Sequence, residues 1–335
     1  MYLKDRRRDG LLLAGAAALI AWGAGGLYQN VQYGFSGGLY TPDYIVPGII
    51  RGSVGAQAGF KPGDRVISVE GIPVEKLGME SRWPRSLVPR IGESRRFLVE
   101  RTGGRVLLNA VYGPLPRNVL NLRLTTALIG LSFLGLGLWA FLRVRTRHAL
   151  ALAHIGLAGG AAASLGLGPN LGSWNGVQGH VSTAATVLMF ILLLRFFVTF
   201  PRPKRLSDSR LAAWAIYGAW GCLLVFLIVE LLVHPALYYT TGTVAYPLML
   251  AYGVLTLAAI VHTLVKTPGA ELHDSGMYLI VTVLLVPIVV FATAIVAELT
   301  LPRWAYALAI AAVPLAMALA VSRQAWAKAT WAAVE

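Results

Sequence analysis

Ionisable side chains inside apolar stretches are the residues of this chain that could do chemistry in a membrane. In the 335-residue sequence four of them stand out, His154, Arg195, Glu230 and Glu298, with His262 near the end of another stretch. Because charge is costly in a bilayer, such residues are candidates for substrate, ion or proton sites. Glu230 and Glu298 fall at similar depth near the outer ends of two successive outward-running stretches, where they either form a polar site open to the outside or are hydrated at the interface. We expect Arg195 to extend to the interface and His154 to be a hydrogen-bonded structural residue.

The apolar stretches contain no motif of a known intramembrane hydrolase. The sequence has no His-Glu-x-x-His for zinc, no Gly-x-Ser-x-Gly occurs within an apolar stretch, and the one Gly-Asp pair, Gly63-Asp64, lies outside those stretches. The single cysteine, Cys222, excludes an intramolecular disulfide and a multi-cysteine metal site, and its apolar surroundings predict a buried side chain. We therefore predict no catalytic residues, no metal site and no cofactor.

The composition points to a membrane protein. Hydrophobic residues make up 56% of the chain and charged residues 13%, although the net charge is +14. Soluble domains carry roughly a quarter charged residues, so a soluble enzyme, a disordered chain and a nucleic-acid-binding domain are disfavoured. The partners that we expect include membrane lipids and no nucleic acid.

Eight stretches have the length and composition of membrane-spanning helices, for which about 20 apolar residues are needed. They cover roughly residues 11–28, 124–142, 149–168, 181–200, 211–233, 246–265, 277–299 and 304–321. We predict a mainly α-helical membrane protein, an eight-span bundle with a small α+β domain inserted between the first two spans. Its parts are a basic N-terminus with the first helix (1–28), an inserted domain (29–118), a seven-helix domain (119–322) and a short tail (323–335).

Basic residues predict the orientation. With the N-terminus inside, the inner segments hold fourteen Lys and Arg, and the three short outer loops hold one, Arg303. This asymmetry places both termini in the cytoplasm and residues 29–118 outside the cytoplasmic membrane of a bacterium. The first stretch is read as a membrane anchor, with a cleaved signal peptide as the alternative.

The region between the first two stretches has the pattern of a small β-rich domain. Residues 66–70 alternate apolar and polar side chains as a half-buried strand does, and residues 97–101 and 105–111 flank a Gly-Gly turn as in a hairpin. Residues 80–91 have the spacing of a short helix. The run Gly52-Ser53-Val54-Gly55-Ala56-Gln57-Ala58-Gly59-Phe60-Lys61-Pro62-Gly63-Asp64-Arg65-Val66-Ile67-Ser68-Val69-Glu70-Gly71 resembles the central motif of bacterial PDZ domains.

PDZ domains bind an extended peptide, often a C-terminus, at a sheet edge. The resemblance implies that a peptide or protein terminus is the partner, in a groove between a strand near residues 45–50 and a helix. Backbone N–H groups of the loop before that strand would bind the carboxylate. The peptide-binding residues implied in this way are Tyr33, Gly34, Phe35, Ile49, Ile50, Trp83, Leu87 and Val88.

The whole arrangement resembles the sensor region of competence-type membrane histidine kinases, which have an extracytoplasmic PDZ domain between the first two spans. The resemblance does not extend to a kinase domain, because only 13 residues follow Ser322 in this sequence. Either a separate cytoplasmic signalling protein is then the partner, or the sequence is a fragment of a longer kinase. We accordingly predict a non-catalytic sensor or adaptor, with a transporter using Glu230 and Glu298, or an unrecognised intramembrane protease, as alternatives.

Overall fold

A computed structural model describes residues 6–34, 38–39, 43–46, 48–49, 53–77, 88–169, 175–204, 209–233, 238–285 and 303–331. Its elements in chain order are α1 (Arg6–Gln32), β1 (Gly38–Leu39), β2 (Gly48–Ile49), α2 (Val54–Gln57), β3 (Arg65–Val69), β4 (Ile72–Pro73), α3 (Val74–Leu77), β5 (Ser94–Arg101), β6 (Gly104–Val111), α4 (Arg117–Val144), α5 (Arg147–Gly166), α6 (Asn175–Thr199), α7 (Arg210–Val233), α8 (Tyr238–Lys266), α9 (Gly269–Asp274) and α11 (Arg303–Trp331). A further helix is described over 277–285.

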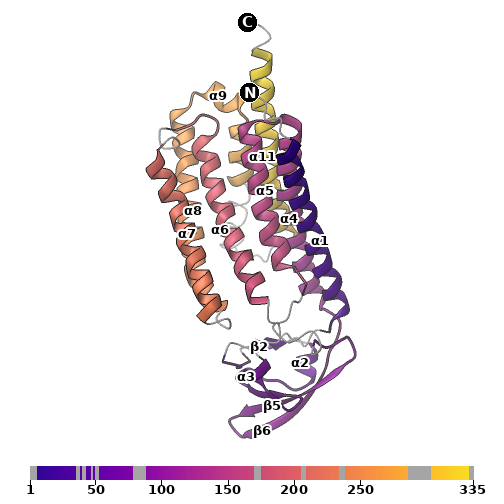
Figure 1. The fold of residues 1–335 in the computed structure, drawn as a ribbon. Helices are drawn as coiled ribbons and strands as arrows, with labels where there is room; N and C mark the ends of the chain where they lie inside the picture. Colours follow the sequence, from indigo (N-terminus) through magenta and orange to yellow (C-terminus); the bar gives the residue numbers. More distant parts are fainter. Residues whose placement is uncertain are drawn as a thin grey trace.

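Long helices form a bundle with the strands at one end (Figure 1). Six described helices are long and apolar enough to cross a membrane, namely α1, α4, α5, α6, α8 and α11, and α7 contributes a shorter apolar stretch, Ile216–Leu232. The mainly helical membrane architecture with a small sheet is therefore confirmed, and the count of eight spans stays a prediction. Helix α1 begins and α11 ends at the end of the bundle away from the strands (Figure 1).

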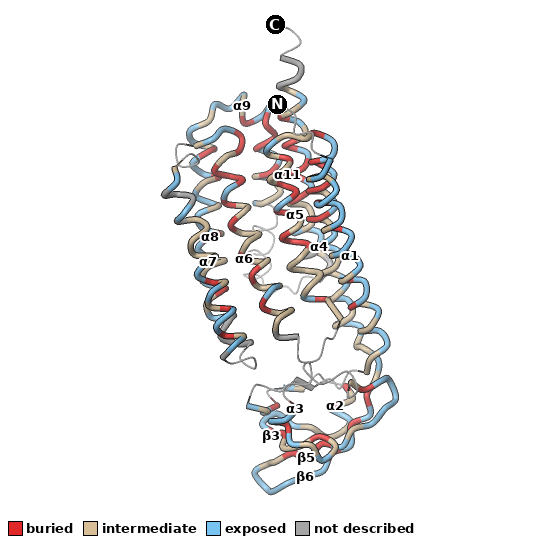
Figure 2. Tube along the Cα trace, in the orientation of Figure 1, coloured by how far each residue is buried: buried red, intermediate tan, exposed pale blue. Residues whose placement is uncertain are grey.

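Glycines bring α4 and α5 into close contact. A Cβ added to Gly137 would lie 2.6 Å from the carbonyl oxygen of Leu152, and one added to Gly156 would lie 2.5 Å from that of Phe133. In lipid, where the hydrophobic effect does not drive helices together, such small residues permit the close backbone packing that stabilises a helix pair. Buried residues run along the inner faces of these helices (Figure 2).

The small domain has a four-stranded antiparallel sheet in the order β4-β3-β5-β6. The predicted hairpin is confirmed, because β5 and β6 pair along their whole length, from Ser94 with Val111 to Arg101 with Gly104. One face of the sheet covers a core of buried side chains that includes Val66, Phe97 and Val99. This core is separate from those of the bundle, so the domain is stabilised by its own apolar burial.

The small domain is joined to the bundle by backbone contacts. Tyr33, directly after α1, forms an antiparallel bridge with Arg90, and the N–H of Gly34 donates to the carbonyl of Pro89 at 2.9 Å. Gly34 also packs so closely on Tyr112 that a Cβ would lie 2.3 Å from the Cβ of that tyrosine. The end of α1 is thus held against the segment that leads from β6 to α4.

Candidate functional site

Asp64 and Arg101 stabilise the turn at residues 59–64 of the small domain through hydrogen bonds. The Asp64 carboxylate, 2% exposed, accepts from the Lys61 backbone N–H at 2.8 Å and from Arg101 Nε and Nη2 at 2.5 and 2.8 Å. Arg101 Nη2 also donates to the carbonyl of Gly59. Burial acts to raise the pKa of Asp64, but the hydrogen bonds from Arg101 and Lys61 outweigh it, so the pKa lies below its ordinary value. The pair shapes the loop and is not aimed at a ligand.

The predicted peptide-binding residues are described only in part. Ile49 and Val88 are partly buried and pack against the same core, as two walls of one groove would. The N–H of Tyr33 donates to Gln29 and that of Gly34 to Pro89, so both are engaged within the chain and are not available to a carboxylate in this state. Phe35, Ile50, Trp83 and Leu87 lie outside the described residues, as does most of the predicted helix at 80–91.

Glu230 lies in buried contact with a histidine that the sequence did not single out. Its Oε2 lies 3.2 Å from Nε2 of His180, and both side chains are 5% exposed. The pair joins the start of α6 to the end of α7, and the start of α6 lies at the end of the bundle that faces the small domain (Figure 1). Two buried ionisable groups in contact are typical of a functional site in a membrane protein.

The other predicted polar residues do not converge on this pair. Arg195 is exposed and donates to the hydroxyl of Tyr217 at 2.6 Å, with its guanidinium 5.5 Å from the tyrosine ring centroid. His154 is exposed on α5, so the predicted hydrogen-bonded structural role has no support from its position. Glu298 lies outside the described residues. The signal that would have found His180 is the polar composition of the first turns of α6.

Those first turns also carry Gln178 and Ser182, which bond to the end of α5. Gln178 Nε2 donates to the carbonyl of Leu165 at 2.5 Å, and Ser182 Oγ donates to that of Ala162 at 2.8 Å. The polar side chains of Gln178, His180 and Ser182 therefore form a layer at the start of α6, at the end of the bundle that faces the small domain. The described residues hold no group of three or more His, Cys, Asp or Glu that could bind a metal ion.

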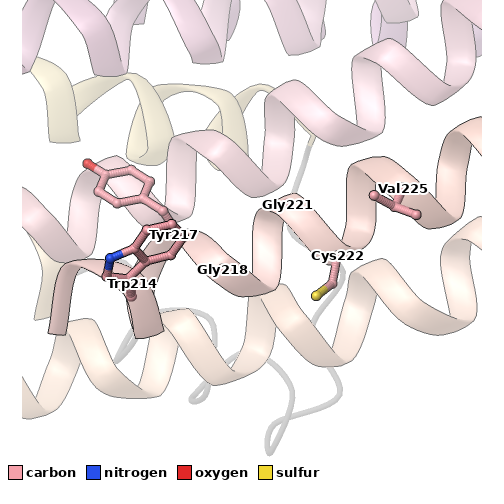
Figure 3. A pocket seen from close by; sticks show the side chains of 6 residues that line it. All are labelled: Trp214, Tyr217, Gly218, Gly221, Cys222 and Val225. Atoms are coloured by element: carbon pink, nitrogen blue, oxygen red, sulfur yellow. The ribbon is translucent and has the colours of Figure 1, made fainter. Parts of the chain in front are cut away.

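A cavity of about 570 Å³ lies on α7 and is lined by Trp214, Tyr217, Gly218, Gly221, Cys222 and Val225 (Figure 3). Its lining is apolar, and Trp214 is 76% exposed. Cys222 is exposed there, so the prediction of a buried side chain is wrong, because α7 turns this face away from the rest of the bundle. We assign no chemistry to this cavity.

Comparisons with known proteins agree with the small domain. Residues 45–81 match the family model described as PDZ domain. Two curated proteins, from Brucella suis and Brucella melitensis, are each named "Putative zinc metalloprotease" and are 42% identical to this chain over 74 residues. The match covers 22% of this chain and 19% of each relative, so the chain spans about one-fifth of the length of these relatives. No solved structure matches.

These relatives correct two predictions. A non-catalytic sensor or adaptor, and the absence of enzymatic activity, are contradicted because the proteins that share the PDZ segment are named as proteases. The findings favour the alternative of a membrane protease. The resemblance to the sensor region of histidine kinases has no support in the comparisons, and the presence of a PDZ domain is confirmed.

Proposed function

We propose that this chain is a membrane-embedded peptidase whose PDZ domain binds the terminus of a peptide or protein substrate. The observation that carries the proposal is a PDZ segment 42% identical to that of two proteins named as zinc metalloproteases, in a chain of membrane-type helices. The PDZ domain would hold the substrate close to the bundle, because the end of α1 pairs directly with it at Arg90. Holding the substrate in this way raises its effective concentration at the bundle.

The ligand set of a protease-type zinc site does not fit the described residues. Catalytic zinc takes three protein ligands, commonly from His-Glu-x-x-His, and neither that motif nor a cluster of three ligands is present in the described part. We therefore derive no step through zinc. The acid–base candidate of the described bundle is the His180–Glu230 pair, because an imidazole held by a carboxylate takes a proton from water and returns it to the leaving amine.

The membrane topology that we propose has eight spans, with the PDZ domain (29–118) between the first and second. The helix over 277–285 begins where the seventh span is predicted, and α7 is apolar over Ile216–Leu232. We place the protein in the bacterial inner membrane with both termini in the cytoplasm. The fourteen-to-one distribution of Lys and Arg, and the location of the start of α1 and the end of α11 at the same end, support this orientation.

The peptide partner would lie in the PDZ groove. Ile49 and Val88 support the predicted position of this groove, and Phe35, Ile50, Trp83 and Leu87 stay proposed members of it. Because Tyr33 and Gly34 use their N–H groups internally, the carboxylate donors would come from residues after Gly34.

A cleavage assay on the full chain in phospholipid nanodiscs tests the function. The probe is a reporter with a single membrane-spanning helix whose C-terminus ends in an apolar residue and a free carboxylate, and the control is the same reporter with an amidated end. We expect mass spectrometry to detect two fragments, produced faster from the free carboxylate. Glu230→Gln should slow cleavage at least tenfold and leave reporter binding unchanged. Absence of cleavage of every reporter, with added zinc and with a chelator, would contradict the proposal.

A further inference from the structure

Two polar atoms at the PDZ-facing end of the bundle are buried without a hydrogen-bond partner. They are the indole Nε1 of Trp22, on α1, and the side-chain Oε1 of Gln178, on α6. One is a donor and the other an acceptor. A buried polar group that lacks a partner costs about 1–3 kcal/mol, so native proteins keep few of them without a use.

Both side chains converge on Gly168, just after the end of α5. A Cβ added to this glycine would lie 2.2 Å from Nε2 of Gln178 and 2.3 Å from Nε1 of Trp22. The two nitrogens are therefore close neighbours around one backbone atom, and the missing side chain of Gly168 gives them their room. A glycine with such close contacts marks a site where groups approach the backbone.

The orientation of the Gln178 amide follows from its other contact. Its Nε2 donates to the carbonyl of Leu165 at 2.5 Å, which only the NH₂ end of the amide can do. Rotating the amide to turn Oε1 toward Leu165 would set an acceptor against an acceptor. With the amide in this orientation, Oε1 is the end that lacks a partner.

We propose that Trp22 and Gln178 form a subsite for the extended backbone of a membrane substrate, an inference that rests on the proposed peptidase function. In lipid, every peptide N–H and C=O must have a partner, and a helix supplies them internally. A peptide bond can be hydrolysed only after its segment leaves the helix, which exposes at least one donor and one acceptor. The Trp22 N–H then donates to a substrate carbonyl, and Gln178 Oε1 accepts from a substrate N–H.

The location of the subsite suits a substrate held by the PDZ domain. Trp22 is on the helix that ends at the bridge between Tyr33 and Arg90, and Gln178 is two residues before His180, which contacts Glu230. Access requires α1 to separate from the end of α5. This helix is exposed along most of its length, and its buried residues are Leu12, Ala16, Gly23 and Gly26.

Conservative variants of the full chain in nanodiscs test the subsite. Trp22→Phe removes the donor and keeps an aromatic ring, and because that donor has no partner in the resting protein, thermal stability should be unchanged or higher. We expect the KM for the membrane-spanning reporter to rise about tenfold, the loss of roughly one hydrogen bond to a buried group, with little change in kcat. The matched control is Trp220→Phe, whose indole donates to the carbonyl of Ala184 at 3.1 Å and which should lose stability without a change in KM.

Filling the space left by the absent side chain of Gly168 gives a second test. Gly168→Ala should raise KM as Trp22→Phe does, whereas Gly166→Ala, whose Cβ would make only an ordinary contact with Ser182 at 3.7 Å, should not. If Gly168→Ala does not fold, Trp22→Phe still decides the question. Equal KM values for wild type, Trp22→Phe and Gln178→Leu would overturn the subsite and leave the peptidase function intact, as expected for atoms bridged only by water.

Photo-crosslinking separates the subsite from the activity. A benzophenone side chain fits at Gly25 and at Gly10, because a Cβ at either position meets no atom within 4 Å. We expect the reporter to crosslink at position 25, one turn from Trp22, and not at position 10. Crosslinking at 25 without cleavage would support the subsite while the peptidase function fails, and equal crosslinking at both positions would overturn the subsite.

Discussion

In the PDZ domain the buried carboxylate of Asp64 is bound by the charged guanidinium of Arg101, whereas polar side chains of the bundle donate mainly to main-chain carbonyls. Trp220 donates to Ala184 in this way, and the Tyr252 hydroxyl donates to the carbonyl of Ile216 at 2.6 Å. An ion pair must gain enough from its hydrogen bonds to offset the desolvation of two charges. A neutral donor that adds to a helix carbonyl needs no such compensation.

The two regions also use glycine differently. Gly63 and Gly71 of the PDZ domain have φ values of +90° and +79°, so they are needed for the backbone shape of turns. Gly137 and Gly156 of the bundle are helical and are needed because any side chain would collide with the facing helix. The difference teaches that turns exposed to water need glycine for its backbone conformation, whereas contacts between helices in lipid, such as that of α4 with α5, need it for its small size.

The largest effect that we expect is the loss of the ion pair between Arg101 and Asp64 in the PDZ domain. Arg101→Met leaves the Asp64 carboxylate buried with the Lys61 N–H as its remaining described donor, and should lower the stability of the PDZ domain by about 3 kcal/mol. Hydrogen–deuterium exchange of the full chain in nanodiscs, read at β3 and β5, measures this loss. Arg105→Met is the control, because its pair with Glu100 is exposed and 3.9 Å long. Equal exchange in the two variants would show that burial of the pair is irrelevant.

A smaller effect is expected at the close contact between α4 and α5 that Gly137 and Gly156 permit. Gly156→Ala places a methyl group 2.5 Å from the Phe133 carbonyl, which should cost about 2 kcal/mol through displacement of α4 from α5. Thermal unfolding in detergent measures the change. Gly135→Ala, on α4 of the same helix pair but with no atom within 4 Å of its Cβ, should be neutral or slightly stabilising. A loss of the same size at both positions would point to helix propensity or a general effect in place of packing.

The smallest effect is the acid dependence of the PDZ domain. Because the folded-state pKa of Asp64 is below its ordinary value, ionised Asp64 stabilises the fold above about pH 4, and this contribution is lost as pH falls toward the folded-state pKa. Pepsin digestion of the full chain between about pH 5 and about pH 2 should cut the PDZ domain before the helices. The acid-dependent part of this loss should shrink in Arg101→Met, and an unchanged pH profile in that variant would contradict the assignment to Asp64.

Much of the fold could be predicted from local patterns. The β5–β6 hairpin follows from alternation around a Gly-Gly turn, and α1, α4, α5, α6, α8 and α11 follow from apolar length, since each property depends on residues near one another in the chain. The partner of Glu230 could not be found in this way. His180 is 50 residues away, and no periodicity relates positions on two helices whose rotation about their own axes is set by packing.

The candidate site shows the same limit in a different form. Gly34 was predicted to donate to a ligand, but its N–H is used by Pro89 because the segment before β5 lies beside the end of α1. The convergence of Trp22, Gly168 and Gln178 comes from three different helices or helix ends and leaves no pattern in the sequence.

The sequence by itself determined that the chain is a helical membrane protein with a small β-rich domain, because hydropathy and turn chemistry are local properties, and the resemblance of one motif in that domain indicated the PDZ family. Only the tertiary structure decided which polar groups meet. Whether a buried donor or acceptor such as Trp22 Nε1 or Gln178 Oε1 has a partner depends on the groups around it. Those groups come from segments more than 100 residues apart in the chain.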